Sequence, residues 1–96
     1  MGHRISIEER AMEEKIQQLF ELIARMETAE DCRDLFSDLC TEREIEKMAE
    51  RVYAAKLLLE GKTYQQVTAQ GDISSATLSR VSRSVRYGKG YSRFLK

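Results

Sequence analysis

The chain has 96 residues, contains no proline, and carries 16 basic and 16 acidic side chains. This length suits one small domain, and a proline-free sequence rich in Leu, Glu, Ala, Lys and Arg favours an all-α fold class. The sequence has no apolar run of membrane-spanning length and no apolar core in its first ten residues. We therefore expect a cytoplasmic protein with no membrane partner.

The two parts of the sequence carry opposite charge. Residues 1–60 hold 9 basic and 15 acidic side chains, a net charge of −6. Residues 61–96 hold 7 basic and 1 acidic, a net charge of +6. The neutral total therefore conceals a basic C-terminal third, which favours an acidic partner for that part of the chain.

The first predicted helix is long and has one apolar stripe. Ser6 and Glu9 have capping-box spacing at its start, and we expect it to end near Met26. Such a stripe is typical of a buried surface, and a helix of this length can lie across a second subunit. The stripe consists of Met12, Ile16, Leu19, Phe20, Ile23 and Met26.

Two further helices are predicted before the glycine at position 61. Thr28 can cap a helix over residues 29–39, and Thr41 can cap another over residues 42–60. The second of these has a broad apolar face, and Gly61 is placed to end it.

Residues 63–86 are predicted to form a helix-turn-helix. Thr63 and Gln66 have capping-box spacing at the start of the first helix, residues 64–70. The turn falls at Gly71 and Asp72, residue types suited to left-handed backbone, and Ser74 or Ser75 begins a second helix that runs to about Arg86. The apolar side chains expected to join the two helices are Val67, Ile73, Leu78, Val81 and Val85.

The remaining positions of the second helix are predicted to face outward and to bind double-stranded DNA. Ser and Thr hydroxyls can bond base edges, and Arg can bind guanine bidentately. No Asp or Glu occurs from Ile73 to the end of the chain. A helical hairpin with a merely solvated basic face is the alternative. The predicted DNA-binding residues are Ser75, Thr77, Ser79, Arg80, Ser82, Arg83, Arg86, Lys89 and Arg93.

The sequence offers little to an enzyme or a metal site. Cys32, Cys40 and the single histidine, His3, have no zinc-like spacing, so we expect two buried thiols and no metal. No nucleophile has a base partner, and no glycine-rich loop follows a strand, so we expect no catalytic residues.

Residues 39–86 resemble the Trp repressor superfamily. The segments that carry the resemblance are LCTEREIEKMAERVYAAKLLLEGKTYQQ and SSATLSRVSRS. The chain is most similar to the Trp-repressor-like YerC/YecD family, whose recognition helices carry a similar ATxSRV pattern. The resemblance implies an interlaced, all-helical homodimer that binds a near-palindromic operator through paired helix-turn-helix units.

The resemblance also implies a ligand pocket. In the Trp repressor, tryptophan lies between two arginines, which Arg51 and Arg80 match here, and Thr41 and Ser84 match two further lining residues. Val81 stands where the repressor has glycine beside the ligand. Its stiff branched side chain would fill the space of a bicyclic ring, so we expect no tryptophan cofactor. Binding without any corepressor and binding of a smaller corepressor both remain open.

Together, these features predict that residues 1–96 form a single Trp-repressor-like domain. Residues 6–60 would supply dimerisation helices, residues 63–86 the helix-turn-helix, and residues 87–96 a basic tail. The expected function is sequence-specific transcriptional regulation as a repressor, with or without a gating ligand. The alternative is a helical protein-interaction module without sequence-specific DNA binding.

Overall fold

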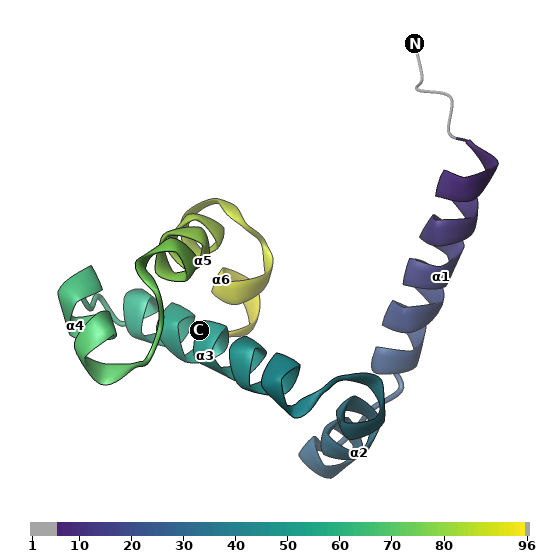
Figure 1. Ribbon diagram of the computed structural model, residues 1–96, viewed down its shortest axis with the longest axis horizontal. Coiled ribbons are helices and arrows are strands. Elements are labelled where there is room, and N and C mark those ends of the chain that lie inside the picture. Colours follow the sequence, from purple (N-terminus) through teal and green to yellow (C-terminus); the bar gives the residue numbers. More distant parts are fainter. Residues whose placement is uncertain (1–5, 96) are drawn as a thin grey trace. The chain divides into compact units, whose positions relative to one another are not determined.

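A computed structural model describes residues 6–95, all of whose regular elements are helices, as the sequence predicted (Figure 1). It forms two compact units, one ending at Leu39 and one beginning at Cys40. The first unit holds α1 (Ile7–Ile23) and α2 (Ala29–Leu39). The second holds α3 (Glu42–Leu59), α4 (Tyr64–Gln70), α5 (Ser75–Tyr87) and α6 (Gly90–Phe94). His3 and Lys96 lie outside the described residues.

The predicted helix starts are confirmed by their hydrogen bonds. The Thr41 hydroxyl accepts from the Glu44 backbone N–H at 3.1 Å, and the Thr41 N–H donates to the Glu44 carboxylate at 2.8 Å, which completes a capping box. Thr63 and Gln66 form the same pair of bonds at the start of α4. At α5 the cap is Ser74, whose hydroxyl accepts from the Thr77 N–H. Local side chains therefore satisfy amides that have no partner within the helix.

Gly61 ends α3 through a left-handed turn. Its φ of 90° is the one positive value among the described residues, and L side chains rarely adopt it. The Lys62 N–H reaches back to the Leu57 carbonyl, and the Gly61 N–H reaches the Leu58 carbonyl, each at 3.0 Å. This pair of bonds is a Schellman motif, and it directs the chain straight into α4.

The turn between α4 and α5 differs from the prediction in its backbone. Gly71 is extended, with φ −132° and ψ 152°, and neither Gly71 nor Asp72 has a positive φ. The expectation of left-handed backbone here was wrong. An extended run that leads into the Ser74 cap makes the change of direction instead.

The core of the second unit is small and joins α3, α4 and α5. The helix-joining residues predicted from the sequence are confirmed: Val67, Leu78 and Val81 are buried, and Ile73 and Val85 pack against them. The buried apolar residues in the described part of the chain are Ala54, Ala55, Leu57, Val67, Leu78 and Val81.

The short helix α6 was not predicted as a helix. Tyr91 and Leu95 pack against the core, whereas Phe94 is 75% exposed. Gly88 allows the chain to leave α5, because a Cβ at this position would lie 2.5 Å from the Ser84 carbonyl oxygen. The helix contacts both α3 and α5.

The first unit has no fully buried side chain in its two helices. Neither α1 nor α2 has a buried residue, and Cys32 is exposed while Cys40 is half-buried, so the expectation of two buried thiols was wrong. Helix α1 ends at Ile23 rather than near Met26, because the Arg25 and Met26 amides bond carbonyls three residues back. In the described part of the chain, no helix is long and apolar enough to cross a membrane.

Because the Thr63 side chain caps α4, the first helix of the helix-turn-helix, its loss should destabilise the fold. We expect Thr63→Ala to lower the free energy of unfolding by about 1 kcal/mol. Thr68→Ala is the matched control, since Thr68 lies inside α4 and bonds only carbonyls of its own helix; it should change stability by less than about 0.5 kcal/mol. Urea unfolding at matched protein concentration measures both. Equal losses would show that the cap has no special role.

Candidate nucleic-acid interface

Helix α5 has one face fixed in the core and another open to solvent. Leu78 is 1% exposed and Val81 is 3% exposed, and both belong to the cluster formed with α3 and α4. Their spacing of three residues puts them on one side of the helix. The opposite side, on which Ser79 and Arg83 are exposed, is therefore held in a fixed orientation by this packing.

The structure places most of the predicted DNA-binding residues at the surface. The exposed ones are Ser75, Ser79, Arg80, Arg83, Arg86, Lys89 and Arg93, and Thr77 is half-buried. Ser82 differs: it was expected to face outward, but it is only 8% exposed. It follows Leu78 by four residues, so it lies on the flank of the apolar side, and this spacing could have revealed its burial.

The basic side chains of α5 are free of acidic partners. Arg43 and Glu46 form an ion pair on α3, with 4.0 Å between their charged groups. No residue of α5 forms an ion pair within the described part of the chain. The Arg93 guanidinium instead lies over the Phe94 ring, 4.9 Å from its centre. The arginines of α5 can therefore offer all their donors to an anionic ligand.

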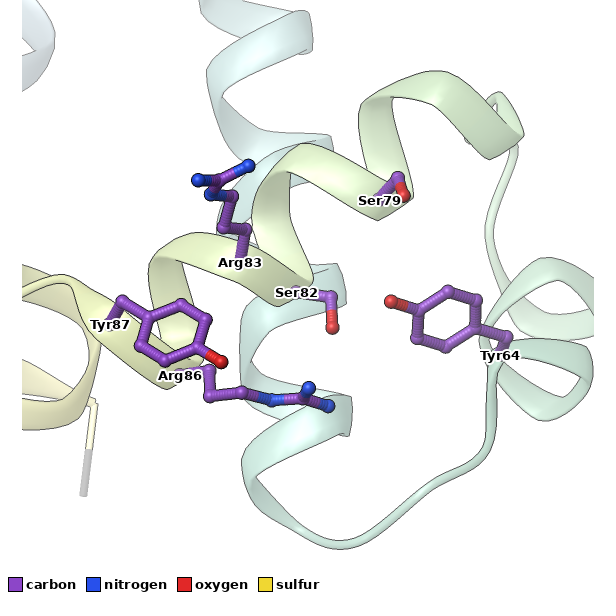
Figure 2. A pocket seen from close by; sticks show the side chains of 6 residues that line it. All are labelled: Tyr64, Ser79, Ser82, Arg83, Arg86 and Tyr87. Atoms are coloured by element: carbon purple, nitrogen blue, oxygen red, sulfur yellow. The ribbon is translucent and has the colours of Figure 1, made fainter.

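A hollow of about 530 Å³ opens on the basic side of the helix-turn-helix (Figure 2). Tyr64 reaches it from α4, and the other lining side chains come from α5. Tyr64 and Tyr87 were not predicted as site residues, because the sequence does not show which residue of α4 lies opposite α5. The lining residues are Tyr64, Ser79, Ser82, Arg83, Arg86 and Tyr87.

A second hollow, of about 250 Å³, brings together four of the five residues expected around a ligand. Arg51 from α3 and Arg80, Val81 and Ser84 from α5 line it, and Arg51 forms no ion pair with the acids of its own helix. Thr77 and Tyr91 complete the lining and were not expected there. Tyr91 comes from α6, the helix that the sequence did not predict.

Thr41 is not part of this second hollow. It lines a separate one of about 330 Å³ that shares Arg51. Its hydroxyl caps α3, and its N–H donates to Glu44, which holds the pKa of that carboxyl below its usual value. Helix capping therefore already accounts for the polar groups of Thr41.

Val81 takes part both in the core and in the wall of the second hollow. Its side chain is almost wholly buried against the cluster, yet it also faces the space beside Arg51 and Arg80. The space beside it is bounded by three hydroxyl-bearing residues and two arginines. Such a lining suits a small carboxylate better than an apolar bicyclic ring.

Comparison with known proteins agrees with this geometry. The sequence model of the Trp repressor protein family matches residues 14–96. The uncharacterised protein YerC of Bacillus subtilis (strain 168) is 40% identical over 74 residues, which cover 77% of this chain and 71% of YerC.

Two solved structures have the same fold. One is described as a candidate Trp repressor from Staphylococcus aureus; it has a TM-score of 0.79 and 36% identity, over 84% of this chain and 82% of that one. The other is a TrpR-like protein from Eubacterium eligens ATCC 27750, with a TM-score of 0.78 and 38% identity, over 83% and 84% of the two chains. With the helix-turn-helix and its basic face in place, the chain belongs to the Trp repressor family of helical, non-enzymatic DNA-binding regulators.

Proposed function

We propose that this protein is a sequence-specific transcriptional repressor that binds double-stranded DNA as a homodimer. The observation that carries the proposal is the exposed face of α5, whose arginines lack acidic partners and whose opposite face is fixed in the core. A helix fixed in this way can enter the major groove without losing its orientation. The basic C-terminal third supplies the attraction to phosphate.

Within this face, different residues have different roles. Arg83 lies in the middle of α5 and carries a guanidinium suited to the O6 and N7 atoms of guanine. Thr77 and Ser79 lie nearer the start of the helix, the part that contacts bases in related motifs. Lys89 and Arg93 lie beyond α5 and contact phosphate, which carries no sequence information.

The homodimer rests on the uncovered stripe of α1. Met12 is 53% exposed, Ile16 45% and Phe20 58%, all on one side of a helix that buries none of its residues. An amphipathic helix of 17 residues obtains most of its stability from packing of its apolar face. A second copy of the chain covers that face in the proposed assembly.

If a small-molecule corepressor binds, it occupies the hollow lined by Arg51 and Arg80. Val81 excludes a bicyclic ring from the part of that space next to α5, so tryptophan is not the ligand. Both arginines can hold a carboxylate bidentately, and the regulator can equally act without a corepressor.

The dimer is tested by its mass. Sedimentation at micromolar concentration should report about twice the chain mass of 11.1 kDa. Phe20→Glu puts a charge in the stripe and should produce monomers, because a buried unpaired carboxylate is costly. Gln18→Glu adds the same charge on the opposite side of α1 and should leave the dimer intact. A well-folded wild-type monomer would contradict the interlaced assembly.

The separation between base and phosphate contacts is tested on a site selected from random duplexes. We expect Arg83→Ala to lose about 1–3 kcal/mol on the selected site and to discriminate less between sequences. Lys89→Ala should weaken binding to every duplex alike and reduce the salt dependence. Fluorescence anisotropy over a salt series measures both effects. If the two variants lose equal affinity on every sequence, Arg83 does not read bases.

The ligand proposal is tested by calorimetry with tryptophan. Wild type should not bind it, whereas Val81→Gly should bind if the arginines still form a pocket once the branched side chain is gone. Because Val81 also belongs to the core, loss of its side chain and the glycine itself destabilise α5. Thermal unfolding therefore has to confirm a folded protein at the temperature of the titration.

Val81→Ala keeps a good helix former at this position and serves as the second variant. We expect this variant to bind tryptophan with lower affinity than Val81→Gly does, and to lose less free energy of unfolding. Tight tryptophan binding by the wild type would refute the argument that Val81 blocks the ring.

A further inference from the structure

Ser82 is a buried polar residue with an unused hydroxyl. It is 92% buried, and its side chain forms no hydrogen bond with any other residue in the described part of the chain. No fully buried side-chain polar atom there lacks a partner. The Ser82 hydroxyl must therefore reach the surface, and the openings available to it are the two hollows that it lines.

These two hollows share three side chains. The hollow of about 530 Å³ on the basic face and a neighbouring one of about 340 Å³ are both lined by Tyr64, Ser82 and Arg86. In Figure 2 the Tyr64 hydroxyl points from α4 toward Ser82, and the Arg86 side chain extends toward the same space. Lys62 adds a second cation to the lining of the smaller hollow. The three shared side chains therefore border the same space between α4 and α5.

The chemistry at this point suits a phosphate group. Two hydroxyls and a guanidinium offer hydrogen-bond donors, and no residue that lines either hollow carries a carboxylate. A phosphate presents only acceptor oxygens and a negative charge, so it can accept from hydroxyls and a guanidinium alike. A base edge presents donors as well as acceptors and would match this set less well.

We propose that Tyr64, Ser82 and Arg86 form a phosphate-binding site, occupied by a backbone phosphate of the bound DNA. This rests on the proposed function, adds Tyr64 to the DNA-binding residues, and assigns Ser82 to a phosphate contact that is independent of base sequence. Arg86 is next to the last residue of the 13-residue α5, far along the helix from the end that contacts bases. The site thus sets the position of the recognition helix, whereas Arg83 reads the sequence.

The test measures the affinity of variants for random-sequence duplexes over a salt series. Tyr64→Phe removes only a hydroxyl and should weaken every duplex by about 3- to 10-fold without changing the salt slope, because no charge is lost. Arg86→Ala should weaken binding and reduce the slope by about 1. Tyr53→Phe is the matched control: Tyr53 is 46% exposed against 47% for Tyr64, and it lines neither hollow.

Ser82→Ala separates binding from folding. Because the hydroxyl has no partner, its removal should leave the unfolding temperature unchanged or higher, while duplex affinity falls as in Tyr64→Phe. If Ser82→Ala lowers both the unfolding temperature and the duplex affinity, Ser82 has only a structural role, and the result counts against the site.

A second arm identifies the source of the phosphate and does not depend on DNA. Inorganic phosphate is titrated into isotope-labelled wild type and Tyr64→Phe, and the amide signals of residues 64, 82 and 86 are followed by NMR. A duplex affinity lowered by Tyr64→Phe supports a DNA phosphate. An unchanged duplex affinity, with phosphate shifts that Tyr64→Phe abolishes, supports a site for a free phosphorylated ligand. If Tyr64→Phe changes neither the duplex affinity nor the phosphate-induced shifts, the proposal is overturned. Failure of wild type to bind any duplex would refute the proposed function alone, since the phosphate titration still reports on the site.

Discussion

The close packing of α5 against α3 is the contact on which the rest of the second unit depends. Ala54 and Ala55 on α3 are 1% and 0% exposed, and a single methyl group on each lets the two helices approach closely. Leu78 and Val81 fill the space beside these methyl groups, and Val67 brings α4 onto the same cluster. A larger side chain at either alanine would force the recognition helix away from α3.

This packing also assigns functions to the sides of α5. With Leu78 and Val81 fixed inward, Arg83 has to lie outward, where a groove can receive it. Arg80 lies between these two sides, next to Arg51 of α3, and so helps line the hollow in which a corepressor would sit. A ligand there touches the same helix that contacts DNA. Ligand binding and DNA binding can therefore be coupled through the orientation of one element.

The core that fixes the orientation of α5 is small. Six apolar residues of the described chain are buried, two of them alanines, and α1 buries none. Small domains have difficulty covering enough apolar surface alone. The exposed apolar stripe of α1 is further surface that can be buried. In the proposed dimer, its burial stabilises the protein and brings two recognition helices together.

Much of this fold could be predicted from the sequence because its signals are local. Caps such as Thr41 and Thr63 act within four residues, and the stripe of Leu78 and Val81 follows from helical spacing alone. Helix α6 was not predicted because it has no side-chain cap, begins with glycine and is little more than one turn long.

The candidate sites were predicted less completely, because they depend on contacts between helices. Periodicity indicates which face of α5 is exposed, but it does not show that Tyr64 of α4 or Tyr91 of α6 comes to lie beside that face. Arg51 and Arg80 were paired through the family resemblance rather than through spacing. Ser82 was misplaced because its polar character was given more weight than its position four residues after Leu78.

In the proposed complex, two copies of α5, each fixed in the core of its subunit, enter the major groove of one duplex. Hydroxyl-radical footprinting of the wild-type protein on a duplex selected from a random pool tests it most directly. We expect two protected patches on one face of the DNA, related by a twofold axis and centred about 10 base pairs, or 34 Å, apart. A single asymmetric patch, or uniform weak protection without any preferred sequence, would contradict it.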